Sequence, residues 1–325
     1  MIMKNKFLLI ASIACLLAIL LPHIEAKNHA VRRASSKEIA ITFDDLPGVQ
    51  LAGAGCDFRV LETLNRKLIA TLVSQKIPAL GLVVESRLCD NKKGSMAGLL
   101  KMWLDAGLEL GNHSFSHFDL NNTPLAKYQA DVIRGESVTR KLLEERGRKI
   151  RFFRHPYLHA GKDLDTKRAF EKFLVERGYQ IAPVTIDNQE WVFAEVYARA
   201  LRSGDSATMK RVGTAYIDYM EQVFDFFERL SIEVVGYEIK QVLLLHDNPL
   251  NADYFDKLVQ MMRKRGYTFI TLEQALKDPA YRLPDNYAGT EGLSWLHRWA
   301  ITKGLKRKVE PREPPWLSRL LTASQ

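Results

Sequence analysis

The sequence predicts an α/β protein: one domain built as a barrel of parallel strands, followed by a helical and basic C-terminal extension. The chain has 325 residues, 46% apolar and 26% charged, which supports a sizeable core and excludes a disulfide mini-domain, a coiled coil or a disordered chain. Seven apolar or β-rich runs alternate with amphipathic stretches over residues 38–276. No glycine-rich dinucleotide or phosphate-binding loop follows any run, so an open doubly wound sheet is the less favoured alternative.

A targeting segment, residues 1–26, is predicted to precede this domain. Lys4 and Lys6 are followed by an unbroken apolar run at 7–21, and residues 24–26 offer a small-residue cleavage site. A helix over this run would rise about 22 Å, short of the roughly 30 Å hydrocarbon core, so a signal peptide is favoured over a membrane span. We therefore expect an exported protein, periplasmic or secreted, with no stable membrane span after cleavage.

The elements of the domain follow in chain order. The first strand is predicted at 38–43, and a helix follows from Phe58 to about Ile77, because apolar residues recur there at helical spacing. The other six strands are predicted at 79–85, 108–112, 151–154, 180–186, 241–245 and 268–272. Amphipathic stretches at 125–145, 167–177 and 254–265 are among the predicted helices between them.

Two longer segments depart from this alternation. Residues 190–240 are predicted to insert two helices between strands. The barrel domain is expected to span 36–280, and the extension, 281–325, to contain one short helix around 292–302. The extension accounts for much of the net charge of +9, and its basic residues after position 296 are Arg298, Lys303, Lys306, Arg307, Lys308, Arg312 and Arg319. The body lacks an obvious basic stripe, so we expect no nucleic-acid partner and only a weak attraction of the tail to anionic polymer or membrane.

The cysteines predict one disulfide. Cleavage of the leader removes Cys15, where lipid anchoring is a less favoured alternative, and leaves Cys56 and Cys89. These two lie in loops after the first and second strands, which leave the same face of a parallel barrel. In an oxidising compartment we expect them to pair at the rim of the active-site face, with two buried free thiols as the alternative.

Residues with catalytic chemistry gather after the first and third strands. Asp44 and Asp45 end the first strand in ITFDDLPG, where one carboxylate can bind a metal while the other faces a water; an ordinary turn before Pro-Gly is the alternative. His113 and His117, after the third strand, are four residues apart, a spacing that pairs imidazoles on zinc in other hydrolases. Two unrelated loop histidines are the alternative.

Further polar residues follow the fourth, fifth and sixth strands. Arg154 could orient a carboxylate bidentately or form a salt bridge at the barrel rim. Asp187, Glu190 and Trp191 follow the fifth strand, and His246 ends the sixth. Because the C-terminal ends of barrel strands gather such residues at one face, all five strand ends are expected to contribute to one site.

The ordered series TFDD (42–45), HSFSH (113–117), RHPY (154–157), DNQEW (187–191) and LLH (244–246) resembles the five signature motifs of the polysaccharide deacetylases, the NodB-homology carbohydrate esterases of family 4. The resemblance extends over residues 38–276. It implies a distorted (β/α)7 barrel and metal-dependent removal of acetyl groups from N-acetylated sugars.

The resemblance also implies a role for each residue. Asp45, His113 and His117 would be ligands of a divalent metal, with zinc expected first and cobalt, nickel or manganese as alternatives. Asp44 would be the general base, held by Arg154.

For the remaining motifs it implies that the Tyr157 backbone amide faces the developing oxyanion and that Tyr157 contacts substrate. His246 would be the general acid, with its charge tuned by Asp187, and Trp191 would wall the acetyl pocket.

The sequence departs from the family pattern at three places. Leu46 and Pro47 stand where a glycine commonly follows the two aspartates, so we expect a different wall beside the base. Glu190 stands where many relatives have a second aspartate, and His155 and His159 are expected to be exposed loop residues.

Several functions remain open at this point. Chitin-like oligomers, peptidoglycan and exopolysaccharide are not separated by the motifs, and a cyclic amide or a small acetylated molecule is an alternative substrate. A catalytically silent carbohydrate-binding barrel is a second possibility. A serine hydrolase that uses Ser114 or Ser116 is a third, disfavoured because no G-x-S-x-G motif is present. The sequence indicates no oligomeric state.

Overall fold

The computed structural model describes residues 37–322 except 52–53 and 90–92. The predicted signal peptide and Cys15 lie outside the described residues. None of the helices in the described part of the chain is both long enough and apolar enough to cross a bilayer.

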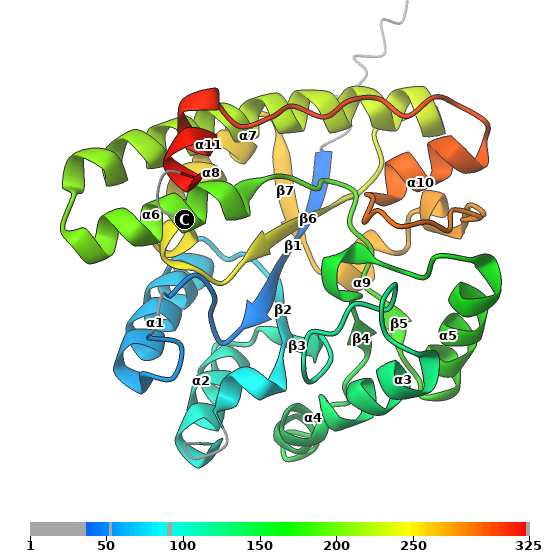
Figure 1. The fold of residues 1–325 in the computed structure, drawn as a ribbon, viewed down its shortest axis with the longest axis horizontal. Helices are drawn as coiled ribbons and strands as arrows, with labels where there is room; N and C mark the ends of the chain where they lie inside the picture. The colour runs from blue at the N-terminus through cyan, green and yellow to red at the C-terminus, as the bar shows by residue number, and fades with distance from the viewer. Residues whose placement is uncertain (1–36, 52–53, 90–92, 323–325) are drawn as a thin grey trace, which may run out of the picture. The chain divides into compact units, whose positions relative to one another are not determined.

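Seven parallel strands lie in the middle of the fold with helices around them (Figure 1). The strands are β1 (Lys37–Leu46), β2 (Ala79–Val83), β3 (Glu109–Asn112), β4 (Phe152–Phe153), β5 (Gln180–Ile181), β6 (Gln241–His246) and β7 (Tyr267–Ile270). All seven predicted strands are therefore confirmed, although β4 and β5 are only two residues long.

In the strand order β5-β4-β3-β2-β1-β6, the long strand β1 also pairs with β7 and so has three neighbours. β6 pairs along one edge of β1, while β7 pairs with the first half of the other edge and β2 with the second half. On its far side β6 is bridged to Ile186, just after β5, so the sheet curls back on itself. The fold is a distorted (β/α) barrel, as the motif resemblance implies.

The helices cover the outside of the strands. They are α1 (Phe58–Ser74), α2 (Lys93–Asp105), α3 (Leu125–Arg134), α4 (Ser137–Glu144), α5 (Leu164–Glu176), α6 (Glu190–Ser203), α7 (Ser206–Val235), α8 (Pro249–Lys264), α9 (Leu272–Ala275), α10 (Trp295–Thr302) and α11 (Pro315–Thr322), with 3₁₀ turns η1 (Glu85–Leu88), η3 (Pro156–Leu158) and η4 (Pro279–Arg282). The two inserted helices, α6 and α7, are confirmed.

Two helix predictions need correction. The stretch 125–145 is two helices, because the chain turns at Gly135, whose missing side chain lets it pass against the Ser114–Phe115 backbone; a Cβ there would lie 2.4 Å from Phe115 N. The extension contains two helices, α10 and α11, where one was expected. Helix α11 has eight residues and starts directly at a Pro-Pro pair, which left too short a periodic pattern to predict it.

The central strand fixes the core because it is buried from Ile39 onward. Phe43 packs edge-on against Trp103 of α2 and Phe255 of α8, with ring centroids 5.9 and 5.3 Å apart. The indole of Trp103 donates a 2.6 Å hydrogen bond to Asn65 Oδ1 of α1, so its one polar atom is satisfied inside the core. Three helices are thereby fixed against the strand that ends in the two aspartates.

The predicted disulfide is present. Cys56, before α1, is bonded to Cys89, after η1, with a Cα–Cα distance of 6.0 Å. It ties the loop after β1 to the loop after β2.

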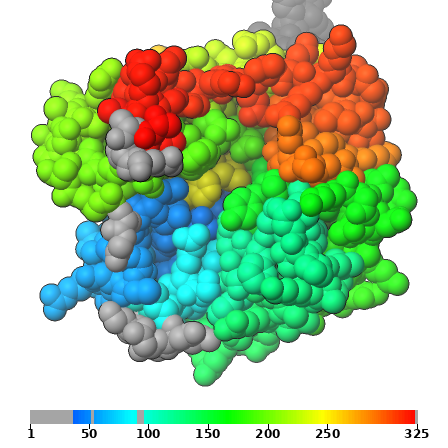
Figure 2. Space-filling model, in the orientation of Figure 1, coloured from blue at the N-terminus to red at the C-terminus, as the bar shows by residue number. Residues whose placement is uncertain are grey.

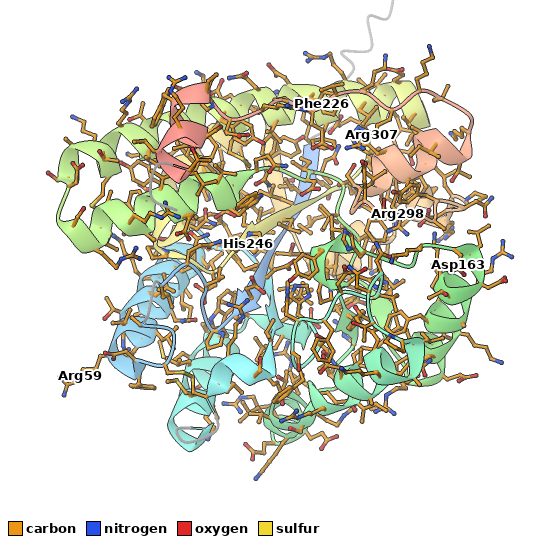
Figure 3. All side chains as sticks on the ribbon, viewed as in Figure 1. Arg59, Asp163, Phe226, His246, Arg298 and Arg307 are labelled. Carbon is orange, nitrogen blue, oxygen red and sulfur yellow. A yellow bond between two sulfur atoms is a disulfide. The ribbon has the colours of Figure 1, made fainter. Side chains whose placement is uncertain are left out.

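The extension packs as part of the same compact unit as the barrel. Buried Lys167 of α5 donates to the carbonyl oxygens of Asp285 (2.7 Å) and Tyr287 (3.0 Å) and forms an ion pair with the Asp285 carboxylate. Arg298 of α10 pairs with the same carboxylate at 2.6 Å and lies over the Trp295 ring. Figure 3 places Arg298 inward from Arg307, on the side of the extension that faces the barrel.

The basic tail is less free than its composition indicates. Arg298 and Lys303 bond within the fold, the latter to the Val234 carbonyl oxygen, while Arg307 pairs with a glutamate and so does Lys308. Partners within the fold thus neutralise or occupy four of the tail's charges, which weakens the expected attraction to anionic surfaces.

Candidate metal centre and catalytic residues

Three predicted ligands meet at the C-terminal end of the strands. One ligand atom from each of Asp45, His113 and His117 lies within 4.8 Å of the other two. His117 Nε2 is 3.4 Å and His113 Nε2 4.0 Å from the same atom, Asp45 Oδ1. Two imidazole nitrogens and one carboxylate oxygen therefore converge on one point.

The chemistry of this set fits a divalent cation. Asp45 Oδ1 is buried and has no hydrogen-bond partner among the described residues, whereas Oδ2 pairs with Arg87 at 3.3 Å. His113 Nδ1 donates to the Arg154 carbonyl oxygen at 2.9 Å, which leaves the Nε2 lone pair toward Asp45. Two imidazole nitrogens and one carboxylate oxygen are a donor set of the kind that catalytic zinc sites use, and a buried carboxylate oxygen without a hydrogen-bond partner fits that role.

The electrostatics favour the protonation states that bind a metal. Burial alone would raise the pKa of Asp45, but the charges of Arg87 and His117 outweigh it and lower the pKa to about 2. Burial, reinforced by His113, lowers the pKa of His117 to about 4. Near neutral pH Asp45 is therefore an anion and His117 a neutral imidazole.

The backbone around this centre is held in left-handed conformations that side chains other than glycine rarely adopt. Asp45 (φ 68°), Ser114 (φ 65°), His117 (φ 55°), Tyr157 (φ 58°) and Leu158 (φ 56°) all have positive φ. Each such residue costs on the order of 1 kcal/mol and persists only where the surrounding structure imposes it, commonly at functional sites. The strain thus coincides with three of the five motifs.

Asp44 is held by Arg154, as expected. Arg154 Nη1 donates to Asp44 Oδ1 at 2.6 Å and to Thr42 Oγ1 at 2.8 Å. The remaining donors of this fully buried arginine bond to the carbonyl oxygens of Ala182 and Pro183. Arg154 therefore fixes one oxygen of Asp44 and leaves the other, 3.7 Å from His113 Nε2, on the side of the metal ligands.

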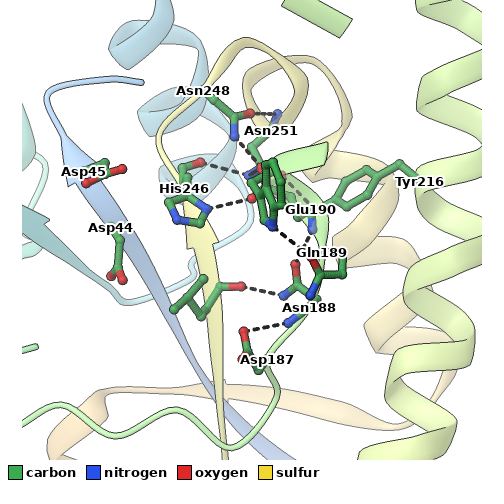
Figure 4. A network of polar contacts seen from close by, with 12 residues as sticks. Asp44, Asp45, Asp187, Asn188, Gln189, Glu190, Tyr216, His246, Asn248 and Asn251 are labelled. Atoms are coloured by element: carbon green, nitrogen blue, oxygen red, sulfur yellow. Dashed lines mark hydrogen bonds and ion pairs between the residues drawn. The ribbon is translucent and has the colours of Figure 1, made fainter. Parts of the chain in front are cut away.

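The partner of His246 is Glu190, where Asp187 was expected. His246 Nδ1 lies 2.7 Å from Glu190 Oε2, and the other oxygen of this buried glutamate accepts from the side-chain amides of Asn248 and Asn251 (Figure 4). Burial opposes the charge of His246, but the Glu190 carboxylate outweighs it and raises the pKa of His246 to about 9. His246 is therefore an imidazolium at neutral pH, whose Nε2 proton is not taken up by the Glu190 contact.

Asp187 lies at the wall of the site without this contact. Its Oδ1 accepts from the Asn188 backbone N–H at 2.8 Å. Burial, and next the charge of Glu310 in the extension, raises the pKa of Asp187 to about 7. The carboxylate that contacts His246 is three residues further along the chain, at Glu190, which is the first residue of α6 and is buried.

A cavity of about 490 Å³ joins these groups; Asp44, Asp45, His113, His117, Tyr157, Asp187, Trp191 and His246 all line it. Arg154 is fully buried and does not line the cavity. Figure 2 shows the face hollowed at its centre, and Figure 3 places His246 there. Tyr157 and Trp191 remain 56% and 44% exposed, so two aromatic rings are available at the mouth.

Sequence reasoning missed or misplaced several side chains. Arg87, which pairs with Asp45, was not predicted. It lies four residues after β2, and a charged residue so soon after a strand end could have indicated a place in the site. His155 is buried against Phe153 and Phe170, and burial lowers its pKa well below the usual range, so the exposed-loop expectation is wrong for it. His159 is half-buried and pairs with an aspartate.

Two further expectations are resolved by burial. Leu46, which was expected to alter the wall beside the base, is buried and packs over Gly81 of β2. Its side chain does not line the cavity. Ser114 is buried, and its hydroxyl accepts a hydrogen bond from the His117 backbone, which disfavours it as a nucleophile.

Comparison with known proteins was made for the whole chain. Residues 32–173, less than half of the chain, match the family model described as polysaccharide deacetylase, and this segment contains the first three of the five motifs. No curated protein sequence matches the chain.

Solved structures with a similar fold share little sequence with this chain. A family 4 carbohydrate esterase from Streptomyces lividans in complex with acetate has 17% identity and a TM-score of 0.46, with 74% of this chain and 95% of that chain covered. The peptidoglycan deacetylase PdaC from Bacillus subtilis has 20% identity and a TM-score of 0.45, with 75% and 93% covered. A CE4 family pseudoenzyme from Bacillus anthracis has 16% identity and a TM-score of 0.47, with 74% and 66% covered.

Proposed function

We propose that this protein is a metal-dependent hydrolase that removes N-acetyl groups from an exported N-acetylated polysaccharide or oligosaccharide. The observation that carries the proposal is the convergence, in one cavity, of three sets of groups. The Asp45–His113–His117 set can hold a divalent cation, Asp44 is fixed by Arg154, and the His246–Glu190 pair lies beside them.

Asp45, His113 and His117 would hold the cation, and zinc suits their N and O donors. A bound divalent cation supplies a Lewis acid that polarises the acetyl carbonyl and acidifies water. Asp44 is placed to take the proton of the attacking water, because Arg154 orients one oxygen and leaves the other toward the site.

The groups opposite the base complete the reaction. The Tyr157 backbone N–H would donate to the oxygen that becomes negative as water attacks the carbonyl. His246, charged at neutral pH because of Glu190, would give its proton to the leaving amine. The amine is otherwise a poor leaving group, so an imidazolium at this position favours an amide over an ester substrate.

The mouth of the site supports a glycan. Tyr157 and Trp191 present exposed rings at the edge of the cavity, and Trp191 is steadied by a 2.9 Å hydrogen bond to Gln189 Oε1. Sugar rings pack on such faces through their C–H groups. Chitin-like, peptidoglycan and exopolysaccharide chains all meet this requirement, and so would fit the site.

Export is part of the proposal. The Cys56–Cys89 disulfide supports an oxidising compartment, since cytosolic thiols are kept reduced. The basic and apolar leader pattern of residues 1–26 supports a signal peptide.

The test is acetate release. The zinc-loaded protein is incubated with N-acetylglucosamine oligomers, peptidoglycan fragments and an acetylated exopolysaccharide, and free acetate is measured beside Asp44→Asn. Acetate from at least one glycan, abolished by chelation and by Asp44→Asn, supports the proposal. Binding of these glycans with no acetate at any metal loading would instead indicate a silent carbohydrate-binding barrel, and chelator-resistant activity would indicate another hydrolase.

A further inference from the structure

We propose that Gly292, in the C-terminal extension, is a positioning residue of the active site. It supports the backbone of Tyr157 and Leu158 in the left-handed conformation on which the direction of the Tyr157 amide depends. This inference rests on the proposed function and deepens it, because it assigns part of the oxyanion-binding geometry to a segment outside the five motifs.

The contact is between backbones. A Cβ at Gly292 would lie 1.8 Å from the Tyr157 carbonyl oxygen, 3.0 Å from its carbonyl carbon and 3.1 Å from Leu158 Cβ. Gly292 itself does not have a left-handed φ, so its own conformation does not require glycine. Glycine is needed here because the Tyr157 carbonyl occupies the space that a side chain would fill.

The supported segment is strained. Tyr157 and Leu158 are successive non-glycine residues with φ of 58° and 56°. Within the turn only short-range bonds hold them: Leu158 N–H donates to the His155 carbonyl and His159 N–H to the Pro156 carbonyl, each at 3.1 Å. Two left-handed residues in a row therefore depend on packing from outside the turn.

The segment that carries Gly292 is anchored to both motif loops. Gly289 N–H donates to the Gly161 carbonyl at 3.1 Å, beyond the Tyr157 turn. Asn121, in the loop that follows His117, donates from Nδ2 to the carbonyl oxygens of Gly289 (3.2 Å) and Thr290 (3.3 Å). Residues 289–292 thus fix the loop of one metal ligand relative to the loop of the proposed oxyanion donor.

The consequence of adding a methyl group follows from this geometry. Gly292→Ala must displace the 157–158 backbone, because a carbonyl group cannot rotate away as a side chain can. The Tyr157 and His117 rings pack edge to face with their centroids 4.6 Å apart, so a displacement of Tyr157 should also change the surroundings of the His117 imidazole. The three atoms nearest to the new methyl belong to Tyr157 and Leu158 and not to a metal ligand, and metal binding should therefore survive.

The experiment compares full-chain, zinc-loaded Gly292→Ala with Gly98→Ala. Gly98 lies in α2 with no heavy atom within 4 Å of its Cβ position, so it adds the same methyl group in open space. Three quantities are measured: zinc stoichiometry, kcat and KM for acetate release, and the His117 imidazole resonances of protein labelled at histidine. We expect Gly292→Ala to keep full zinc, to lower kcat roughly 10- to 100-fold with KM within about twofold, and to shift the His117 resonances. Gly98→Ala should change none of them.

A folded Gly292→Ala with wild-type kcat and unmoved His117 resonances would overturn the inference. If Gly292→Ala does not fold, Asn121→Ala replaces it, because it releases residues 289–290 without adding bulk and should move the same resonances. If the wild-type protein releases no acetate, the proposed function fails, but the His117 resonances still decide whether Gly292 positions the Tyr157 turn.

Discussion

Glu190→Gln is the substitution that most directly tests the chemistry of the site. It keeps the shape of the side chain and removes the charge that raises the pKa of His246 from its ordinary 6.5 to about 9. The amide oxygen can still accept a hydrogen bond from Asn248 or Asn251, so the substitution removes the negative charge while the side chains of the polar network can stay in place. A general acid must be protonated to act, and therefore the alkaline limb of activity should move to lower pH in the variant.

The magnitude follows from the pKa. A shift from 6.5 to about 9 corresponds to at most about 3 kcal/mol of preference for the imidazolium. The His246 side chain is 20% exposed, so solvent screens part of this, and we expect a displacement of roughly one to two pH units. The same shift affects folding, because the native state holds the His246 proton more tightly than the unfolded chain. That stabilisation is fully present below pH 6.5 and is lost as the pH rises through about 9.

Two measurements test the predicted effects of Glu190→Gln on activity and on stability. The pH profile of kcat/KM is recorded for wild type and Glu190→Gln with the same metal loaded, and the metal-free proteins are unfolded with urea at pH 6 and pH 10. The stability difference between wild type and variant should be larger at pH 6. Glu195→Gln is the matched control, since it removes from the same helix a charge that pairs with Arg199 and not with His246. An alkaline limb that is identical in wild type and Glu190→Gln would refute the assignment of His246 as an acid tuned by Glu190.

The remaining predictions concern the metal, the base and the disulfide. His113→Ala should lose the metal, as measured by elemental analysis; full stoichiometry with undiminished affinity would remove His113 from the ligand set. Asp44→Asn should keep the metal and lose turnover by roughly 10² to 10⁴, whereas Asp45→Asn should impair both, and near-normal turnover of Asp44→Asn would place the base elsewhere. Cys56→Ser should lower the free energy of unfolding by roughly 3 to 4 kcal/mol, because the crosslink closes a loop with a sequence separation of 33. Thiol titration of the unfolded wild type should detect Cys56 and Cys89 only after reduction; two free thiols beforehand would contradict the bond.

The sequence was sufficient to predict the strands and the polar residues that stand at their C-terminal ends. Alternation of apolar runs with amphipathic stretches predicted all seven strands, and the strand ends carried Asp44, His113, Arg154 and His246 to one face because parallel strands place their C-terminal ends together. Which carboxylate reaches His246 was not predictable in this way. Asp187 and Glu190 are three residues apart, and the choice between them depends on where α6 starts and how the preceding turn is oriented.

Contacts between distant backbones were also beyond sequence reasoning. The break between α3 and α4 at Gly135, and the packing of Gly292 on Tyr157, join segments separated by long stretches of chain. Neither glycine is in a turn that demands a left-handed φ, so local patterns give no sign of either. Only the close approach of another backbone explains them.

These glycines suggest how the site tolerates its strain. Beside Asp45, Leu46 fills the space left by Gly81; the Ser114–Phe115 backbone lies on Gly135; and the Tyr157 carbonyl lies on Gly292. At Gly81 the contact is with the Leu46 side chain, whereas at Gly135 and Gly292 the backbone of a strained motif loop packs directly on the glycine, and none of these glycines needs positive φ itself. A left-handed residue is unstable alone because nothing prevents its return to the extended or right-handed region. A backbone packed directly on a neighbouring backbone blocks that return more firmly than a flexible side chain would. The barrel therefore sets the direction of the candidate catalytic residues, and Gly135 and Gly292 allow the close backbone packing that holds two of their loops in unfavourable conformations.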